Sequence, residues 1–331
     1  MAPPPPGCDL RSMKELPRLI LAREHVQQGL TPKKLAKRCR SGVLVRVRQG
    51  VYVDGEAWRA LQPWEQYRLR VSAAAEAFTA PTVFARHSAA SVWGVPTIGQ
   101  RHPVHALTLQ NAGGRSRAGV QRHYAAPDGL KVFRREGLLV TGRVRTVLDL
   151  AAFTPFAQAI VPLDHVLRPD AAQGLPALSK EMLLAGVEGN YTAAAALRIR
   201  TAVEFADPRS GSPGESYSRG LMWVAGFQPP ELQHEVRDSA GLAGYTDYYW
   251  ETARLAGEFD GVEKYLKPEY LRGRTASQAV VDEKERENRI RAMGLRVVRW
   301  VWADLMEPGR LEQKLAAFGV PRRRARSAVW P

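Results

Sequence analysis

The sequence predicts a multidomain chain that combines α+β and α/β architecture. Helical patterns followed by a hairpin-like pattern occupy its start, and its middle mixes helices with strands. Near its end a helix, three strands, a helix and a strand follow one another. A turn cluster at 207–214 (Asp-Pro-Arg-Ser-Gly-Ser-Pro-Gly) precedes this last part. With 331 residues, 45% of them hydrophobic, the chain is long enough for two or three domains with cores of their own.

These patterns divide the chain into five segments. Residues 1–10 form a proline-rich lead that we expect to be disordered, and residues 321–331 form a basic tail. Between them we expect an N-terminal part at 11–57, a middle part at 58–206 and a C-terminal part at 207–320.

The charge of the chain restricts its partners. It carries 48 Lys+Arg against 33 Asp+Glu, a net charge of +15, which favours a polyanion, first of all nucleic acid and less so acidic lipid. The alternative is a basic protein whose arginines reflect GC-rich codon usage. Two cysteines provide neither a disulfide framework nor a zinc set, which fits a reducing cytoplasm. The start lacks an apolar signal region, and Pro155 and Pro162 interrupt the longest apolar run, so we expect no secretion and no membrane span.

The N-terminal part has the pattern of a winged helix-turn-helix. Thr31 is suited to cap a helix and Pro32 to begin one, and the short helix expected at 33–39 is basic. The segment 43–53 (Val-Leu-Val-Arg-Val-Arg-Gln-Gly-Val-Tyr-Val) alternates around a Gln49-Gly50 turn, as a β-wing would.

A local excess of basic residues makes this part a candidate DNA reader. Residues 1–60 contain 12 Lys+Arg and 5 Asp+Glu, a balance of 12 − 5 = +7. We expect the helix to enter the major groove and the wing to contact phosphate or the minor groove. The candidate contacts are Lys33, Lys34, Lys37, Arg38, Arg40, Arg46 and Arg48. The alternative is a solvated basic face on a small helical bundle that contacts protein.

The middle part alternates between helical and strand patterns. We expect helices at 84–96 and 143–152 and strands at 104–109, 120–124 and 138–141. Arg145 and Asp149 have the spacing of a helical ion pair. His87, His105 and His123 lie on separate elements, which favours capping or packing over metal binding.

Two stretches resemble AbiEi-type antitoxins, the repressor half of type IV toxin–antitoxin systems. The first comprises Gly29-Leu-Thr-Pro-Lys-Lys-Leu and Gly42-Val-Leu-Val-Arg-Val-Arg-Gln-Gly-Val-Tyr. The second is the order of His-Ser-Ala-Ala, a strand pair and Arg-Thr-x-x-Asp-Leu across the middle part. The resemblance covers roughly residues 15–170. It implies that the middle part restrains a nucleotidyltransferase-type toxin.

Acidic residues on aromatic strand patterns distinguish the C-terminal part. Asp247 lies in Gly244-Tyr-Thr-Asp-Tyr-Tyr-Trp, and Glu258 and Asp260 share one face of the next strand. Because burying carboxylates side by side is costly without a cation, their convergence indicates a divalent metal such as Mg²⁺ or Mn²⁺. The alternative is that these acids are exposed at strand ends and that 282–291 is a salt-bridged solvent face.

With a strand at 231–236, the C-terminal part resembles the αβββαβ core of restriction-endonuclease-like PD-(D/E)xK nucleases, most closely the Vsr-like branch. The resemblance rests on Asp247, Glu258-Phe-Asp-Gly, the charged helix and the final Val-x-Arg strand. It implies that Asp247 and Glu258 bind metal. Glu215 would be an accessory acid and Asp260 a further acidic group. The family's lysine is replaced by Asp260, and the lysines that would serve instead are Lys264 and Lys284.

Together these features predict a cytoplasmic protein that binds double-stranded DNA and carries a metal-dependent endonuclease-like domain. Hydrolysis would use Mg²⁺ or Mn²⁺ to polarise the phosphoryl oxygen and activate water. The rival hypothesis is a non-enzymatic repressor or antitoxin with a degenerate nuclease fold. A third is a basic RNA-binding protein.

Overall fold

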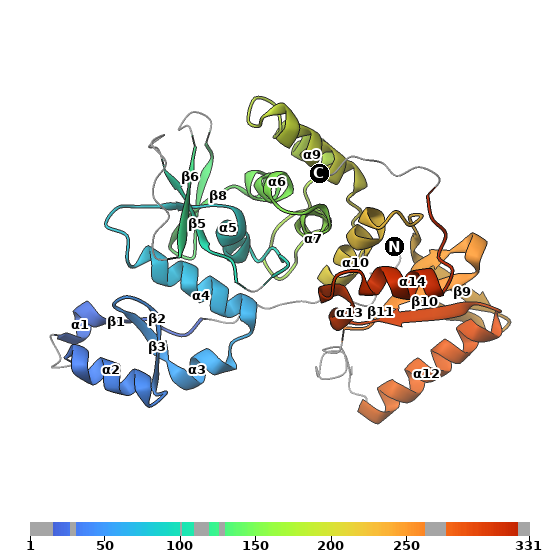
Figure 1. Ribbon diagram of the computed structural model, residues 1–331, viewed down its shortest axis with the longest axis horizontal. Helices are drawn as coiled ribbons and strands as arrows, with labels where there is room; N and C mark the ends of the chain where they lie inside the picture. The colour runs from blue at the N-terminus through green and yellow to red at the C-terminus, as the bar shows by residue number, and fades with distance from the viewer. Residues whose placement is uncertain are drawn as a thin grey trace. The chain divides into compact units, whose positions relative to one another are not determined.

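The computed structural model describes residues 16–26, 31–99, 101–108, 119–125, 130–261 and 276–323 (Figure 1). The fold is mixed α+β and contains sheets of three, four and five strands in this part of the chain. Its described residues form two compact units. The N-terminal unit belongs to Leu10–Phe153 and Pro169–Ala195, and the C-terminal unit to Thr154–Arg168 and Ala196–Pro331.

The first elements of the N-terminal unit surround a three-stranded antiparallel sheet of order β1-β3-β2. They are β1 (Ile20–Leu21), α1 (Ala22–Val26), α2 (Pro32–Arg40), β2 (Leu44–Arg48), β3 (Val51–Asp54), α3 (Gly55–Ala60) and α4 (Pro63–Ala75). Strands β2 and β3 form the expected hairpin, and Gly50 at its turn has a φ of +74°, which glycine adopts without strain.

Helix α4 packs on this small sheet. Ala73 of α4 is completely buried in a cluster with Leu21 and Val51. We expected α4 to belong to the middle part, which begins at residue 58. The N-terminal and middle parts instead share one unit, because the apolar face of α4 covers the sheet.

A five-stranded sheet of order β6-β5-β4-β8-β7 forms the rest of the N-terminal unit. Its elements are β4 (Val83–Phe84), α5 (Arg86–Trp93), β5 (Val104–Thr108), β6 (Val120–Tyr124), β7 (Val132–Arg135), β8 (Leu138–Thr141), α6 (Arg143–Phe153) and α8 (Lys180–Ala185). Helix α5 ends at Gly94 in the left-handed conformation, as the sequence predicted, and the expected pair Arg145–Asp149 forms at 2.8 Å.

Helix α7 (Phe156–Val166) contains the second part of the apolar run that we expected two prolines to interrupt. Pro155 precedes its first residue, but Pro162 lies inside the helix, so only the first proline breaks the run. No helix of the described residues is long and apolar enough to cross a membrane.

Helix α7 belongs to the C-terminal unit, where it packs against α10 (Pro213–Val224). Gly220 allows this close approach, since a β-carbon there would lie 2.5 Å from Cα of Ala157. We expected residues 156–166 within the middle part, ahead of a boundary at 206. Their apolar face packs instead on an element that lies beyond that boundary.

The C-terminal unit contains a four-stranded sheet of order β12-β11-β10-β9, antiparallel except between β11 and β12. Its remaining elements are α9 (Ala193–Phe205, which begins in the N-terminal unit), β9 (Glu231–Asp238), β10 (Gly241–Trp250), a 3-10 turn (Glu251–Ala253), β11 (Leu255–Phe259), α12 (Ala276–Ala292), β12 (Arg296–Trp300), α13 (Trp302–Met306) and α14 (Arg310–Ala317). Helix α10 covers one face, where the Trp300 indole N–H donates to the Ser218 hydroxyl at 2.8 Å. Gly214 permits this packing, because a β-carbon there would lie 2.0 Å from the Phe259 ring.

Candidate nucleic-acid interface and carboxylate cluster

Helix α2 begins as the sequence predicted. The Thr31 hydroxyl accepts a hydrogen bond from the backbone N–H of Lys34 at 3.3 Å, and Pro32 occupies the first turn. Leu35 is buried against the small sheet and fixes which side of the helix faces inward. The polar side of α2 is therefore held outward by its own cap and core contact.

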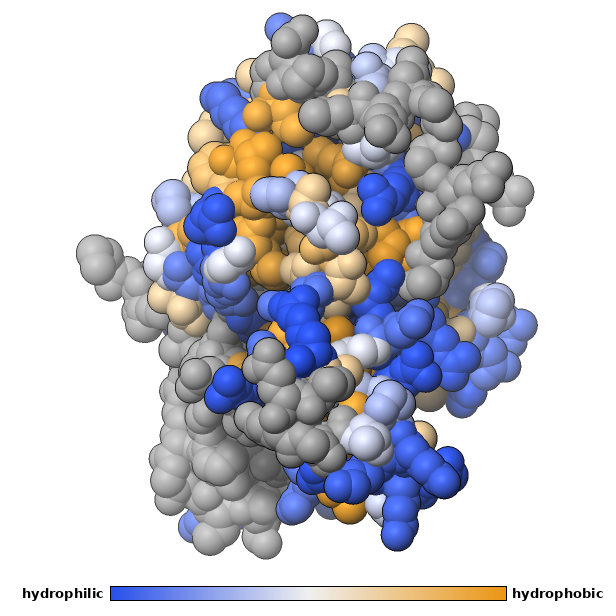
Figure 2. All heavy atoms as spheres, turned by 90° about the vertical axis from the view of Figure 1, so that its left-hand side faces the viewer, coloured by the Kyte–Doolittle hydropathy of each residue, from blue (hydrophilic) through white to orange (hydrophobic). Residues whose placement is uncertain are grey.

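The basic residues of α2 and the hairpin form a surface that we call the basic face. Its members are Lys33, Lys34, Lys37, Arg38, Arg40, Arg46 and Arg48. All are exposed except Arg48, which is half-buried and whose pKa is lowered by burial. Figure 2 shows this side of the molecule, and hydrophilic residues predominate among the coloured atoms of its lower half, where α1 and α2 lie in Figure 1. The structure thus brings the predicted DNA contacts together on accessible elements.

Hydrophobic residues gather in the upper half of the same view, where the five-stranded sheet lies (Figure 2). The sheet exposes apolar side chains: Val132 and Phe133 of β7 are 40% and 44% exposed, and Tyr124 of β6 is 50% exposed. Strands β6 and β7 are the two edges of this sheet, so Tyr124 lies at the edge opposite to Val132 and Phe133. Isolated exposed apolar residues are ordinary, so these side chains do not by themselves define a contact surface.

Asp247 and Glu258 lie on neighbouring strands, as expected. Strands β10 and β11 pair Tyr248 with Gly257, and one step further along this register Asp247 lies across from Glu258. Oδ2 of Asp247 accepts a hydrogen bond from the backbone N–H of Phe259 at 2.8 Å. The two acids thus approach each other at one end of the sheet.

Two arginines bind the carboxylate of Glu258, which is only 6% exposed. Arg286 of α12 contacts Oε1 at 2.6 Å, and Arg299 of β12 contacts Oε2 at 2.8 Å. Arg299 lies directly opposite Glu258 in the parallel register and also contacts Glu287 of α12 at 3.0 Å. We call Asp247, Glu258, Glu287, Arg286 and Arg299 the carboxylate cluster.

The donor set of this cluster does not fit Mg²⁺ or Mn²⁺. Each oxygen of Glu258 already contacts a guanidinium group, and Asp247 accepts a backbone hydrogen bond. Within the described ranges, no three His, Cys, Asp or Glu side chains are arranged so that they could hold a metal ion. A hard cation needs several oxygen ligands directed at one point, and arginines beside them oppose its charge.

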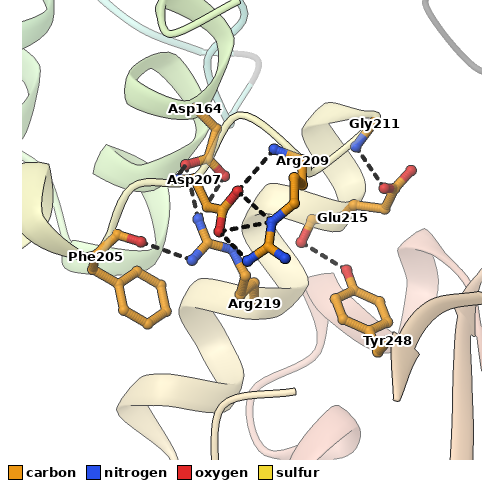
Figure 3. Close-up of polar contacts among 8 residues, drawn as sticks. All are labelled: Asp164, Phe205, Asp207, Arg209, Gly211, Glu215, Arg219 and Tyr248. Atoms are coloured by element: carbon orange, nitrogen blue, oxygen red, sulfur yellow. Dashed lines mark hydrogen bonds and ion pairs between the residues drawn. The ribbon is translucent and has the colours of Figure 1, made fainter. Parts of the chain in front are cut away.

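Glu215 of α10 lies on the other side of the sheet from Glu258. Its carboxylate accepts a hydrogen bond from the Gly211 N–H at 2.6 Å, and its carbonyl accepts one from the Tyr248 hydroxyl at 2.7 Å (Figure 3). The carboxylate also accepts a hydrogen bond from the Gln233 side chain at 3.2 Å. Tyr248 points to α10, so its neighbour Asp247 points the opposite way. Glu215 therefore organises the start of α10 and does not join Glu258.

The remaining candidates from the sequence lie apart from a common centre. Asp260 follows β11 and is 3.6 Å from Arg299, at the edge of the cluster. Lys284 of α12 is exposed, and Lys264 lies outside the described residues.

A buried ion pair in the C-terminal unit was not predicted. Arg219 of α10 binds both oxygens of Asp164 of α7 at 2.8 Å, and Asp164 also accepts a hydrogen bond from the Asp207 N–H (Figure 3). Burial raises the pKa of the Asp164 carboxyl above its ordinary value, and the nearby Arg219 guanidinium opposes this rise. The turn cluster at 207–214 is thus packed into the unit.

Four histidines stack in the N-terminal unit. The rings of His87 and His102 are 3.8 Å apart, and Nδ1 of His105 lies 2.8 Å from Nε2 of His123. Burial lowers the pKa of His87 to about 2, of His105 to about 3 and of His123 to about 4. The expected packing role of His87, His105 and His123 fits this arrangement. His102 was missed, because it lies between the predicted elements.

No family model matches the chain. It is 29% identical over 290 residues to "Uncharacterized protein Rv2248" of Mycobacterium tuberculosis (strain ATCC 25618 / H37Rv) and to "Uncharacterized protein MT2308" of strain CDC 1551 / Oshkosh. Each alignment covers 87% of this chain and 96% of the relative. Among solved structures, the Rv2827c protein of Mycobacterium tuberculosis aligns with a TM-score of 0.38 and 18% identity, over 67% of this chain and 84% of that one.

Proposed function

We propose that this protein is a cytoplasmic DNA-binding regulator of the antitoxin-repressor type, which contacts duplex DNA through its basic face. The observation that carries the proposal is the set of exposed lysines and arginines on α2 and on the adjoining hairpin. Clustered positive charge on a helix and an adjoining hairpin suits contacts to the phosphates and to the groove of duplex DNA.

The order of the first elements supports a winged helix-turn-helix. Helix α1 is followed by α2, and α2 by the β2–β3 hairpin, while β1 adds a third strand to the hairpin. In this arrangement α2 would enter the major groove, and Arg46 and Arg48 would contact phosphate or the minor groove.

The C-terminal unit has the element order of a nuclease-like fold, which in this proposal does not cleave DNA. The sequence α10, β9, β10, β11, α12, β12 has the αβββαβ order of the PD-(D/E)xK nucleases that it resembles. The arginines that contact Glu258 favour a degenerate site in that fold. This supports the hypothesis of a non-enzymatic repressor or antitoxin over that of an endonuclease.

A toxin partner is the second part of this proposal. The resemblance to AbiEi-type antitoxins covers the five-stranded sheet, and the edge strand β7 of that sheet exposes Val132 and Phe133. A nucleotidyltransferase-type toxin would bury Val132 and Phe133 on binding. Co-purification of such a toxin with the wild type, lost in Phe133→Asp, would support this assignment.

Fluorescence anisotropy with a labelled duplex tests the DNA-binding proposal. Lys33→Ala/Lys37→Ala should weaken binding and make the dependence of log K on log salt shallower by about 1.8, since each lost phosphate contact removes about 0.9. Lys131→Ala/Arg134→Ala removes the same charge from exposed residues of the five-stranded sheet region and is the matched control. Equal losses in both variants would contradict a specific role for the basic face, and preference for RNA in competition would favour the third hypothesis.

The rival function is metal-dependent cleavage of DNA. Its specific support is that Asp247 and Glu258 lie across from each other on β10 and β11. Cleavage of plasmid that disappears in Asp247→Ala, with DNA affinity retained, would establish this rival.

A further inference from the structure

We propose that Arg286 and Arg299 take the place of a divalent cation at Glu258, so that the carboxylate cluster is a closed ion-pair centre that fixes α12 to the sheet. The proposal concerns the C-terminal unit alone and does not depend on DNA binding by the basic face. It assigns a structural role to the acids that the sequence marked as metal ligands.

The burial of Glu258 requires a positive partner. A carboxylate removed from water is strongly destabilising unless cations and hydrogen bonds compensate. Glu258 is 6% exposed, and one guanidinium group lies on each of its oxygens. The charge of this carboxylate is therefore neutralised by the chain itself.

The two arginines connect three elements through Glu258. Arg286 extends from α12 and also donates to the backbone carbonyl of Tyr245 on β10 at 2.8 Å. Arg299 extends from β12 and reaches back to Glu287 on α12 at 3.0 Å. Ion pairs thus run from α12 to β11, from β12 to β11 and from β12 to α12, and they hold the helix on the sheet face opposite α10.

Gly244 leaves the space that Arg286 occupies. A β-carbon at Gly244 would lie 3.0 Å from Cδ and 3.2 Å from Cγ of Arg286. The backbone of β10 is therefore shaped to accept the arginine stem, as a preformed ion-pair site requires.

Replacing Glu258 by glutamine distinguishes the ion-pair centre from a metal site, because the two roles predict changes of opposite sign in the stability of the fold. In an ion-pair centre, Glu258→Gln removes the buried carboxylate that Arg286 and Arg299 share, and so destabilises the fold. In a metal site without its metal, the same change relieves repulsion between neighbouring carboxylates and maintains or raises stability.

The experiment measures thermal unfolding of the full chain with and without millimolar Mn²⁺, together with Mn²⁺ binding by electron paramagnetic resonance. We expect the wild type to bind no Mn²⁺ and to keep its midpoint, and Glu258→Gln to lower the midpoint by roughly 5–15 °C. Glu312→Gln, which removes the exposed partner of Arg322, is the matched control and should leave the midpoint nearly unchanged.

Stoichiometric Mn²⁺ binding that raises the wild-type midpoint and is lost in Glu258→Gln would overturn the proposal. So would a Glu258→Gln protein as stable as the wild type. If Glu258→Gln does not fold, the Mn²⁺ titration of the wild type decides between the two roles. Arg286→Ala supplies a further variant: it keeps every carboxylate, removes one guanidinium partner of Glu258, and should also lower the midpoint.

Discussion

The basic face and the carboxylate cluster hold charges in opposite ways. On α2 and the hairpin, like charges lie side by side in solvent, where repulsion is screened and a polyanion can reach them. Around Glu258, opposite charges are buried together and contact each other at 2.6–2.8 Å. Both regions stand out in the sequence as unusual concentrations of charge.

This difference teaches that the availability of charged groups, more than their number, distinguishes a ligand site from a structural one. The basic face has exposed donors held by a capped helix. The carboxylate cluster has few oxygens left to offer a ligand, because arginines from two elements bind Glu258. The following predictions test each side of this contrast, in order of decreasing effect.

Loss of the buried carboxylate of Asp164 should have the largest effect on the stability of the protein. Asp164→Ala leaves Arg219 buried without its partner, and we expect a loss of about 3–5 kcal/mol in the free energy of unfolding. Urea denaturation of the full chain measures it. The double variant Asp164→Ala/Arg219→Met should recover much of the loss, and an additive double variant would show that the two side chains are not coupled.

Acid should destabilise the N-terminal unit through its stacked histidines. Burial lowers the pKa of His87 to about 2 and of His105 to about 3, whereas the unfolded chain takes up these protons near pH 6.5. The contribution of these two neutral histidines to the free energy of unfolding is therefore complete above pH 6.5. It decreases toward pH 4 by up to about 1.4 kcal/mol per pH unit for each group. Urea midpoints at pH 7 and pH 5 measure the loss. His87→Leu should flatten the slope, and an unchanged slope would refute this origin.

Removal of the helix cap should have a moderate effect on the basic face. Thr31→Ala deletes the hydroxyl that accepts the Lys34 N–H, and we expect a loss of about 1 kcal/mol. Hydrogen exchange of the α2 amides, followed beside DNA affinity, checks it. Thr31→Ser keeps the acceptor and should behave as the wild type; equal losses in both variants would exclude the cap as the cause.

A single residue of the hairpin should have the smallest effect. Arg46→Ala removes one exposed cation of β2, so DNA binding should weaken about equally for all sequences, and the salt slope should become shallower by about 0.9. Anisotropy titrations at several salt concentrations measure both quantities. A loss confined to one DNA sequence would instead assign Arg46 to base recognition.

Local elements could be predicted from the sequence because short-range chemistry determines them. Thr31 and Pro32 begin α2, Gly50 turns the hairpin, and Gly94 ends α5, each through its own backbone preference. The pairing of β10 with β11 followed from alternation and loop length, which also placed Asp247 near Glu258.

Long-range partners could not be predicted in the same way. Arg299 and Arg286 meet Glu258 only after β12 joins the sheet and α12 packs on it, and one sequence does not show which arginine will arrive there. Likewise α7 joins α10 through Asp164 and Arg219, although the turn cluster at 207–214 separates the two helices in the sequence. The missed features are therefore tertiary ion pairs, which also decide whether the acids are available to a metal.

The most direct test of the account incubates the purified protein with plasmid and millimolar Mg²⁺ or Mn²⁺, then measures DNA retention and cleavage in the same samples. The account predicts retention that weakens in Lys33→Ala/Lys37→Ala, with the plasmid left intact. Cleavage that is present in the wild type and absent in Asp247→Ala and Glu258→Gln would contradict it and establish a metal-dependent nuclease.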